Sequence, residues 1–379
     1  MHLRCCSHLY LPYLAQNDVM SPSQWLVVFI SRDRKINLNR SHWKESWTSN
    51  HHQIQLLGNM LVFYLQLKGV EYKNMSQKVA YLYHSDLPNH YYDVSHPMKP
   101  SRIRMAHNLV LSYGLFNHMD CYELQPATMK ELTRFHSYDY IHFLKKVGQQ
   151  QTKHGRDISK YTTSDCPMFS NVYDFCCLSS GGSLDAAKLL GDYDTVVHWG
   201  GGLHHAKANI ANGFCYTNDI VLGICELLKK YERVLYLDID IHHGDGVEEA
   251  FYATNRVCTV SFHRYGEFFP GTGHYRDIGT AEGKGYAVNI PLKEGIDDES
   301  YEYIFKPIMD SLMEWYRPNC IFMQCGADSL AGDRLGRFNI TMEGHGACVE
   351  YMKSFNLPMI LVGGGGNQHL FRVYCQKCK

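Results

Sequence analysis

Short apolar runs, each closed by glycines or polar residues, recur along the chain from Lys78 onward. Runs of roughly four to eight apolar residues between turn signals are typical of buried strands. We therefore expect strands that begin at Thr195 and at Cys320, together with five more at 79–83, 233–241, 257–263, 285–291 and 357–362.

Segments with helical periodicity lie between these runs. We expect helices at 103–113, 172–190, 220–230 and 298–316, and over 126–147 with a turn at 135–137. Asn218 or Asp219 is the expected N-cap of the third of these helices, and 149–164 is expected to be a polar loop. Strands that alternate with helices predict an α/β fold with a central, mostly parallel sheet and helices on both faces.

The first 74 residues differ from the rest because no period is sustained there. Leu56–Leu67 is short enough to be either a helix or a buried strand. The sequence Met75-Ser-Gln-Lys78 is typical of a protein start, so we expect Met75 to be the natural initiator, with 1–74 as an added extension and 75–366 as one domain.

Ionisable residues concentrate at the end of the strand 233–241. One set of alternate positions is Leu235, Leu237, Ile239 and Ile241, and the other is Val234, Tyr236, Asp238, Asp240 and His242. We interpret the first face as core and the second as the face that carries chemistry, with Gly244 and Gly246 ending the strand. Buried carboxylates need a cation, a histidine or several donors, so this stretch predicts a metal site.

Two further strands deliver similar residues. The strand from Thr195 runs into glycines and then the tandem pair His204-His205, and the strand from Cys320 runs into Asp328. Aspartates at a single strand end often only cap the next helix. Three strands with this ending favour a shared site instead, because ligands bind at the carboxyl ends of parallel strands.

Composition narrows the classes of function. The 379 residues carry a net charge near -1 and are 45% hydrophobic, which gives no basic footprint for direct DNA binding. The 14 cysteines form no regular framework, so we expect a reducing compartment, the nucleus or the cytoplasm. No apolar run reaches the roughly 18 residues of a membrane span.

From about Lys78 to Gly366 the chain resembles the class I histone deacetylases, which have the zinc-dependent arginase/deacetylase fold. The motifs that carry the resemblance are His96-Pro-Met-Lys-Pro100, Gly201-Gly-Leu-His-His-Ala206, Gly213-Phe-Cys-Tyr216, Asp238-Ile-Asp-Ile-His-His-Gly-Asp-Gly246, Phe269-Pro-Gly-Thr-Gly273, Gln324-Cys-Gly-Ala-Asp328 and Gly363-Gly-Gly-Gly366. The resemblance implies hydrolysis of acetyl-lysine on histone tails to lysine and acetate, in transcriptional repression within a nuclear corepressor complex.

The resemblance also implies roles for the clustered residues. Asp240, His242 and Asp328 would bind Zn²⁺, although this oxygen-rich set accepts Fe²⁺ as well. His205 would be the general base, oriented by Asp245. His204, paired with Asp238, would act electrostatically, and a K⁺ would lie near this pair and Ser261.

Other implied roles concern the substrate and the surface. Gly213, Phe214, Phe269 and Leu335 would line a narrow tube for the lysine stem, and Asp165 would hold the substrate backbone at the rim. Arg102 would lie by an acetate exit. Lys99 and Arg334 would bind an inositol phosphate at the corepressor interface, with simple solvation as the alternative.

The chain departs from the family directly after the four glycines. The family has a tyrosine there that donates to the oxyanion, whereas this chain has Asn367 and a divergent tail, 367–379. Loss of one oxyanion donor typically lowers the rate on the order of 100 to 1,000-fold. Two alternatives therefore stand beside an active deacetylase. One is a weakly active or inactive scaffold, and the other is an arginase relative with two manganese ions, which the single set Asp240, His242 and Asp328 and the tandem histidines argue against.

Overall fold

The computed structural model describes residues 77–148 and 155–366. All of them belong to the second of two units into which the chain divides, Ser76–Lys379. The segment 56–67 and the tail 367–379, including Asn367, lie outside the described residues. The expected domain boundaries at 74 and 366 therefore stay predictions.

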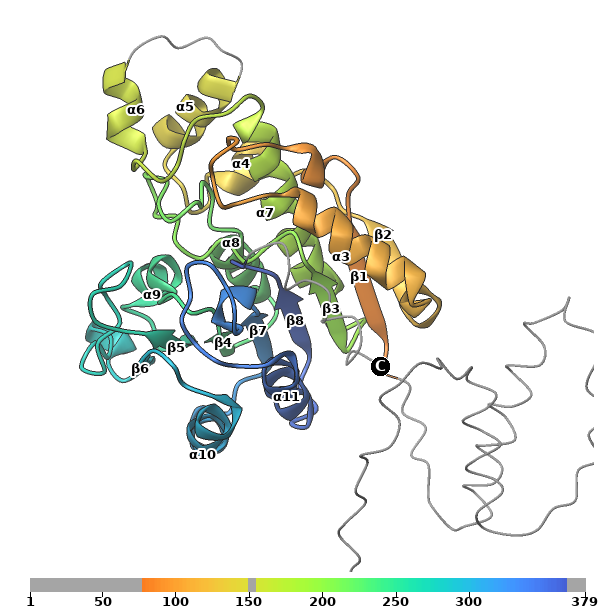
Figure 1. The fold of residues 1–379 in the computed structure, drawn as a ribbon, viewed down its shortest axis with the longest axis vertical. Coiled ribbons are helices and arrows are strands. Elements are labelled where there is room, and N and C mark those ends of the chain that lie inside the picture. The colour runs from red at the N-terminus through yellow and green to blue at the C-terminus, as the bar shows by residue number, and fades with distance from the viewer. Residues whose placement is uncertain (1–76, 149–154, 367–379) are drawn as a thin grey trace, which may run out of the picture. The chain divides into compact units, whose positions relative to one another are not determined.

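Eight strands form one sheet in which every pairing is parallel (Figure 1). In sheet order they are β2 (Asp120–Glu123), β1 (Val79–Tyr83), β3 (Thr195–His198), β8 (Met359–Val362), β7 (Cys320–Gln324), β4 (Val234–Asp238), β5 (Val257–Arg264) and β6 (Ala287–Leu292). The predicted α/β fold with a parallel sheet is confirmed. The sequence pattern missed only β2, an edge strand whose four residues are all exposed and so form no apolar run.

Helices cover both faces of this sheet. The described α-helices are α3 (Ser101–Ser112), α4 (Met129–Leu132), α5 (Tyr138–Gly148), α6 (Gly155–Tyr161), α7 (Val172–Leu189), α8 (Asp219–Leu227), α9 (Asp245–Phe251), α10 (Asp298–Tyr316) and α11 (Met342–Lys353). Short 3₁₀ turns are η2 (Leu87–Asn89), η3 (Leu115–His118), η4 (Ala281–Gly283) and η5 (Ala327–Ser329). Among the described helices, none combines the length and the apolar character that a bilayer crossing requires.

Two apolar cores result, one on each face. Helices α5, α7, α8 and α9 pack on one face, and α10 and α11 pack on the other. Tyr236 of β4 joins the first core, whereas Leu235 and Leu237 join the second. Both faces of this strand are therefore core, because a parallel sheet is buried on both faces, and the face expected to carry chemistry does so only at its end, at Asp238.

The chemistry begins instead where the strand ends. β4 stops at Asp238, three residues earlier than expected, and the backbone N–H of Asp240 then donates to the Asp238 carboxylate over 3.0 Å. Asp240 and His242 consequently lie in the loop before α9, and Gly244 is the N-cap of that helix rather than part of a strand.

Three described helices, α6, α9 and α11, were not expected from the sequence, and one expected cap is present. α6 occupies part of the stretch expected to be a polar loop. α11 contains Gly344 and Gly346, which weaken its helical pattern, but the Thr341 side chain caps its first turn. The expected N-cap Asn218 is confirmed, because its Oδ1 accepts from Val221 N at 3.2 Å.

Candidate metal centre and tandem-histidine site

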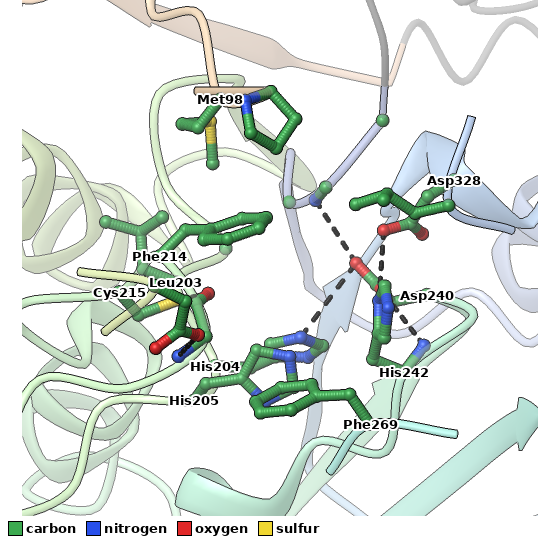
Figure 2. A pocket seen from close by; sticks show the side chains of 18 of the residues that line it. Met98, Leu203, His204, His205, Phe214, Cys215, Asp240, His242, Phe269 and Asp328 are labelled. Carbon is green, nitrogen blue, oxygen red and sulfur yellow. Dashed lines mark hydrogen bonds and ion pairs between the residues drawn. The ribbon is translucent and has the colours of Figure 1, made fainter. Parts of the chain in front are cut away.

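The expected site residues gather at the carboxyl ends of the central strands β3, β8, β7 and β4. The loops that follow these strands enclose a cavity of about 400 Å³ (Figure 2). The residues that line it include Asp165, His204, His205, Gly213, Phe214, Asp240, His242, Phe269, Asp328 and Leu335. Every predicted metal ligand and substrate-contacting residue thus borders one cavity.

Asp240, His242 and Asp328 form a compact cluster of potential ligands. One ligand atom from each lies within 4.8 Å of the others, and it is the one such cluster among residues 77–148 and 155–366. His242 Nδ1 lies 3.0 Å from Asp240 Oδ1 and 3.2 Å from Asp328 Oδ2. Three donor atoms therefore converge on one point, as a mononuclear metal centre requires.

The second oxygen of each carboxylate is held away from that point. Asp240 Oδ2 accepts from Gln324 Nε2 at 2.9 Å and from Gly365 N at 3.1 Å. Asp328 Oδ1 accepts from Ile241 N at 3.1 Å. Each aspartate consequently presents a single oxygen toward His242.

The electrostatics of this cluster call for a cation. Burial, and then the charge of Asp240, raise the pKa of Asp328 well above its ordinary range. Burial lowers the pKa of His242, but hydrogen bonds and charges from Asp240 and Asp328 outweigh it and raise that pKa to about 10. In the metal-free protein the imidazolium proton thus offsets part of the negative charge of the carboxylates, and a bound divalent ion would replace it. The residues present fit such an ion.

The tandem histidines each donate to a different carboxylate. His204 Nδ1 donates to Asp238 Oδ2 and His205 Nδ1 donates to Asp245 Oδ1, both over 2.7 Å. The two rings are adjacent, with centroids 3.9 Å apart. Because Nδ1 carries the hydrogen in both rings, Nε2 is the nitrogen left for proton exchange.

The pKa values of the two histidines are shifted in opposite directions. Burial lowers the pKa of His204, but the charges of Asp238 and Asp240 outweigh it and raise the pKa to about 9. Burial and the positive charge of His204 lower the pKa of His205 to about 3, against the opposing effect of Asp245. At neutral pH the pair therefore consists of a cation and a neutral base.

Two side chains whose roles the sequence did not reveal contact the aspartates of the His204–Asp238 and His205–Asp245 pairs. Lys207 Nζ lies 2.7 Å from Asp245 Oδ2, so Asp245 is shared between a lysine and His205. The Tyr236 hydroxyl donates to Asp238 Oδ2 over 2.5 Å. Lys207 follows the tandem histidines by two positions, but nothing in the sequence indicates which way its side chain turns.

Asp219 fixes the loop that carries the histidines. It was expected only as an alternative helix cap, yet its carboxylate accepts from Leu203 N at 2.8 Å and from Gly202 N at 3.0 Å. The Ser183 hydroxyl of α7 donates to the same carboxylate over 2.5 Å. The first residue of α8 therefore ties the tandem-histidine loop to the helices behind the sheet.

Aromatic side chains wall the cavity. The rings of Phe269 and His205 lie 5.0 Å apart between centroids, and Phe268 stacks on His242 at 4.9 Å. Gly213 precedes Phe214 with φ of +55°, and a Cβ there would lie 2.3 Å from the His205 ring, so only glycine fits. The Asp165 carboxylate accepts from Gly213 N at 3.0 Å, which fixes it at the rim.

The remaining expected residues lie around this cavity. Arg102 is buried in its wall and donates to the carbonyls of Gly366, over 2.7 Å, and Gly364. Lys99 Nζ donates to the carbonyls of Asp93 and Val94, and Arg334 is exposed.

Ser261 stands opposite Asp238 in the β4–β5 pairing. Its hydroxyl contacts His263 Nδ1 at 2.9 Å.

The sequence analysis did not identify several residues that line or support the cavity. They are Pro97, Met98, Leu203, Cys215, Glu267, Phe268, Asp333 and, behind the metal ligands, Gln324. Five of them stand inside motifs that were recognised, so their positions were the available signal: Pro97, Met98, Leu203, Cys215 and Gln324. Glu267 and Asp333 belong to loops whose course no local pattern predicts.

Comparison with known proteins agrees with this site. The family model described as histone deacetylase domain matches residues 96–375, and so continues past Gly366 into the tail. Histone deacetylase 1 of Homo sapiens is 57% identical over 294 residues, which are 76% of this chain and 61% of that protein. Histone deacetylase RPD3 of Saccharomyces cerevisiae is 54% identical over 305 residues, 79% of this chain and 70% of that protein.

Histone deacetylase HDAC1 of Drosophila melanogaster is 56% identical over 294 residues, 76% of this chain and 56% of that protein. The chain thus spans less than two thirds of the length of several curated relatives, including the human one. The family model nevertheless covers most of the chain, including all three residues of the metal cluster. On this evidence the chain belongs to the class I histone deacetylase family.

Proposed function

We propose that the chain is a zinc-dependent protein lysine deacetylase that acts on acetylated histone tails. The observation that carries this proposal is the adjacent pair His204 and His205, each hydrogen-bonded through Nδ1 to its own aspartate, beside the cluster of Asp240, His242 and Asp328. Amide hydrolysis needs both a base for water and positive charge near the developing oxyanion. The names of the relatives support the same reaction.

Zinc is the metal that the donor set favours. Catalytic zinc sites use three protein ligands of nitrogen and oxygen type and leave a position for water or substrate. Two carboxylate oxygens and one imidazole nitrogen meet that pattern, although Fe²⁺ accepts the same ligands. A bound ion of this kind polarises the amide carbonyl and lowers the pKa of water.

His205 serves as the general base in this proposal. Its depressed pKa keeps Nε2 free of a proton at neutral pH, and Asp245 stabilises the imidazolium that forms when Nε2 accepts a proton from water. The same proton can then pass to the leaving lysine amine. In the metal-free protein the charges of Asp238 and Asp240 raise the pKa of His204, and a cationic His204 would stabilise negative charge on the substrate oxygen.

The cavity suits an acetylated lysine. Its aromatic walls at Phe214 and Phe269 provide an apolar passage for a four-methylene stem (Figure 2). Leu335 also lines the cavity and is 39% exposed. Asp165, already oriented by Gly213, is placed to accept from the substrate backbone. Arg102 is a buried residue of the same wall, and its positive charge would attract the released acetate.

Further parts of the proposal concern ions and partners. Ser261 and the strand end at Asp238 would hold a K⁺. Lys99 and Arg334 would bind an inositol phosphate at a corepressor interface, with Arg334 the more exposed of the two. The protein would work in the nucleus, and also in the cytoplasm, without direct contact to DNA.

Acetate release from an acetyl-lysine peptide tests the proposal. The full chain is loaded with one equivalent of Zn²⁺ and compared with chelator-treated protein and with His205→Ala. We expect zinc-dependent turnover that falls roughly 100 to 10,000-fold in the variant, because general-base catalysis contributes that much.

Stoichiometric zinc without turnover would favour the scaffold alternative. The observation behind that alternative is Asn367, at the position where the family motif has a tyrosine. Two bound metal ions per chain would instead favour the arginase-like alternative.

A further inference from the structure

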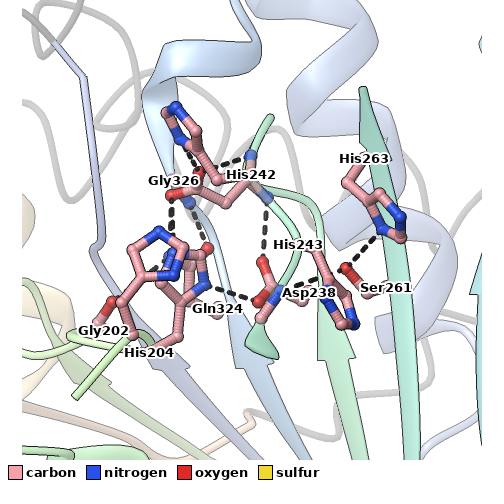
Figure 3. A network of polar contacts seen from close by, with 12 residues as sticks. Gly202, His204, Asp238, His242, His243, Ser261, His263, Gln324 and Gly326 are labelled. Carbon is pink, nitrogen blue, oxygen red and sulfur yellow. Dashed lines mark hydrogen bonds and ion pairs between the residues drawn. The ribbon is translucent and has the colours of Figure 1, made fainter. Parts of the chain in front are cut away.

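Gln324 occupies the centre of the polar network beneath the cavity (Figure 3). It is the last residue of β7, fully buried, and it pairs in register with Val362 of β8 and Asp238 of β4. This position places its side chain between the loops that leave the three central strands.

The Gln324 amide makes three hydrogen bonds, one to each of three site loops. Its Nε2 donates to Asp240 Oδ2 at 2.9 Å and to the Gly202 carbonyl at 3.3 Å, and its Oε1 accepts from Gly326 N at 2.7 Å. If the amide were flipped, its oxygen would face two other oxygens, Asp240 Oδ2 and the Gly202 carbonyl, and its NH₂ group would face the N–H of Gly326. The three bonds therefore allow one orientation only.

The neighbouring backbone is shaped to admit this amide. A Cβ at Gly326 would lie 1.9 Å from Asp240 Oδ2, so no side chain fits between the amide and the carboxylate. With Oδ2 held by Gln324 and Gly365 N, Asp240 turns only Oδ1 toward His242. Without Gln324, Oδ2 would keep one hydrogen bond, from Gly365 N, while His242 N would still donate to Oδ1 at 3.0 Å.

We infer that Gln324 is a positioning residue of the metal centre. Its amide holds Asp240 as a one-oxygen ligand, and through Gly202 it fixes the tandem-histidine loop relative to the metal ligands. Residues that hydrogen-bond a metal ligand typically change metal affinity by about 10 to 100-fold when removed. The inference rests on the metal centre of the proposed function and assigns it a further residue.

Zinc affinity, measured by competition with a chelator, tests the inference without any need for turnover. Gln324→Met keeps the length of the side chain and removes all three hydrogen bonds. Gln324→Glu keeps the shape but turns the donor into an acceptor facing Asp240. We expect the zinc Kd to rise about 10 to 100-fold in the methionine variant. The glutamate variant should also bind zinc more weakly than wild type.

Asn289→Leu is the matched control. Asn289 is another buried amide, bonded to Glu248 at 2.6 Å and to the Asp277 carbonyl at 3.0 Å, and it does not line the cavity. This variant should lose stability as a Gln324 variant does, yet keep the zinc Kd within about twofold, because its partners are not ligands.

Cobalt spectra supply a second measurement. If Asp240 rotates and binds through both oxygens, the coordination number rises and the visible absorption of the Co²⁺-loaded Gln324→Met protein weakens relative to wild type. Unchanged Kd and unchanged spectra in both Gln324 variants would overturn the inference, as would an equal loss of zinc affinity in Asn289→Leu. A wild-type chain that binds no zinc would overturn the proposed function itself.

Discussion

His204 and His205 show how strongly single contacts set the chemistry of one residue type. Both are buried in the same loop and both donate to an aspartate over 2.7 Å. His204 also faces the charge of Asp240, whereas the carboxylate beside His205 is shared with Lys207. The charges of Asp238 and Asp240 favour the charged form of His204, and burial together with the charge of His204 favours the neutral form of His205.

Lys207→Met should move the acid limb of the pH–rate profile to higher pH. The substitution leaves Asp245 to His205 alone, so the imidazolium of His205 is better stabilised and its pKa rises. His205 must be neutral to act, so activity is then lost at a higher pH as the pH falls. The measurement is kcat/KM against pH.

Lys188→Met is the control for that profile, because Lys188 pairs with Asp185 on α7, outside the cavity. Profiles of Lys207→Met and wild type that superimpose would show that Lys207 does not act on the His205–Asp245 pair.

Asn367→Tyr should raise kcat by about 10 to 1,000-fold, because a tyrosine hydroxyl would supply an oxyanion donor used mainly in the transition state. Zinc content must match before and after the substitution. An effect on KM alone, or none, would mean that position 367 does not lie near the reacting carbonyl.

At the scale of elements, the pattern predicted the strands well and the loops poorly. β3, β4, β7 and β8 are apolar on both faces because helices cover the sheet twice, and such runs are visible in any sequence. β2 is exposed, and α11 carries two glycines, so neither shows the pattern of its class.

The candidate site was likewise predictable in part. That its aspartates and histidines meet was predictable, because residues that follow several buried parallel strands lie at one edge of the sheet, whereas the choice of ligands among them came from the family resemblance. The contacts of Lys207 and Asp219 were not predictable, because they join residues whose proximity depends on how the loops fold.

The turn between α4 and α5 is tied to the site by His136. Its Nδ1 donates to the Ala208 carbonyl over 3.3 Å, and its Nε2 accepts from Asn218 N at 3.0 Å. These bonds require the neutral ring, and burial lowers the pKa of His136 to about 4. The turn thus depends on a histidine that must stay uncharged.

His136→Gln should therefore make stability less sensitive to acid. In the wild type the unfolded state binds the His136 proton near pH 6.5 and the folded state only near 4, so stability falls as pH drops through that window, by about 1.4 kcal/mol per pH unit at most. Glutamine has no such proton. Urea unfolding of metal-free protein at pH 7 and pH 5 measures the difference, and equal losses in both proteins would refute the assignment.

For the whole molecule, the parallel sheet gathers ligands from distant parts of the chain at one edge. Asp240 and Asp328 are 88 positions apart in the numbering, yet each follows a central strand and faces His242. Zinc binding should consequently link β4 and β7 and stabilise the folded domain as a unit.

Asp240→Ala should abolish that stabilisation. At a zinc concentration 100 times Kd, the wild type gains about 2.7 kcal/mol, visible as a higher Tm, while the variant has too few ligands to respond. His242→Ala should behave alike. A zinc-dependent rise in Tm in either variant as large as in wild type would disprove the ligand assignment.

One oxygen of each aspartate, Asp240 Oδ2 and Asp328 Oδ1, already accepts hydrogen bonds from the protein and does not face His242. This arrangement also affects which metal ions the centre can bind. Calcium needs six to eight oxygen ligands and commonly takes both oxygens of a carboxylate, and magnesium needs an octahedral shell of oxygens. A rigid set that offers two oxygens and one nitrogen suits neither ion. The centre can therefore hold a scarce transition metal in a cell where magnesium is far more abundant.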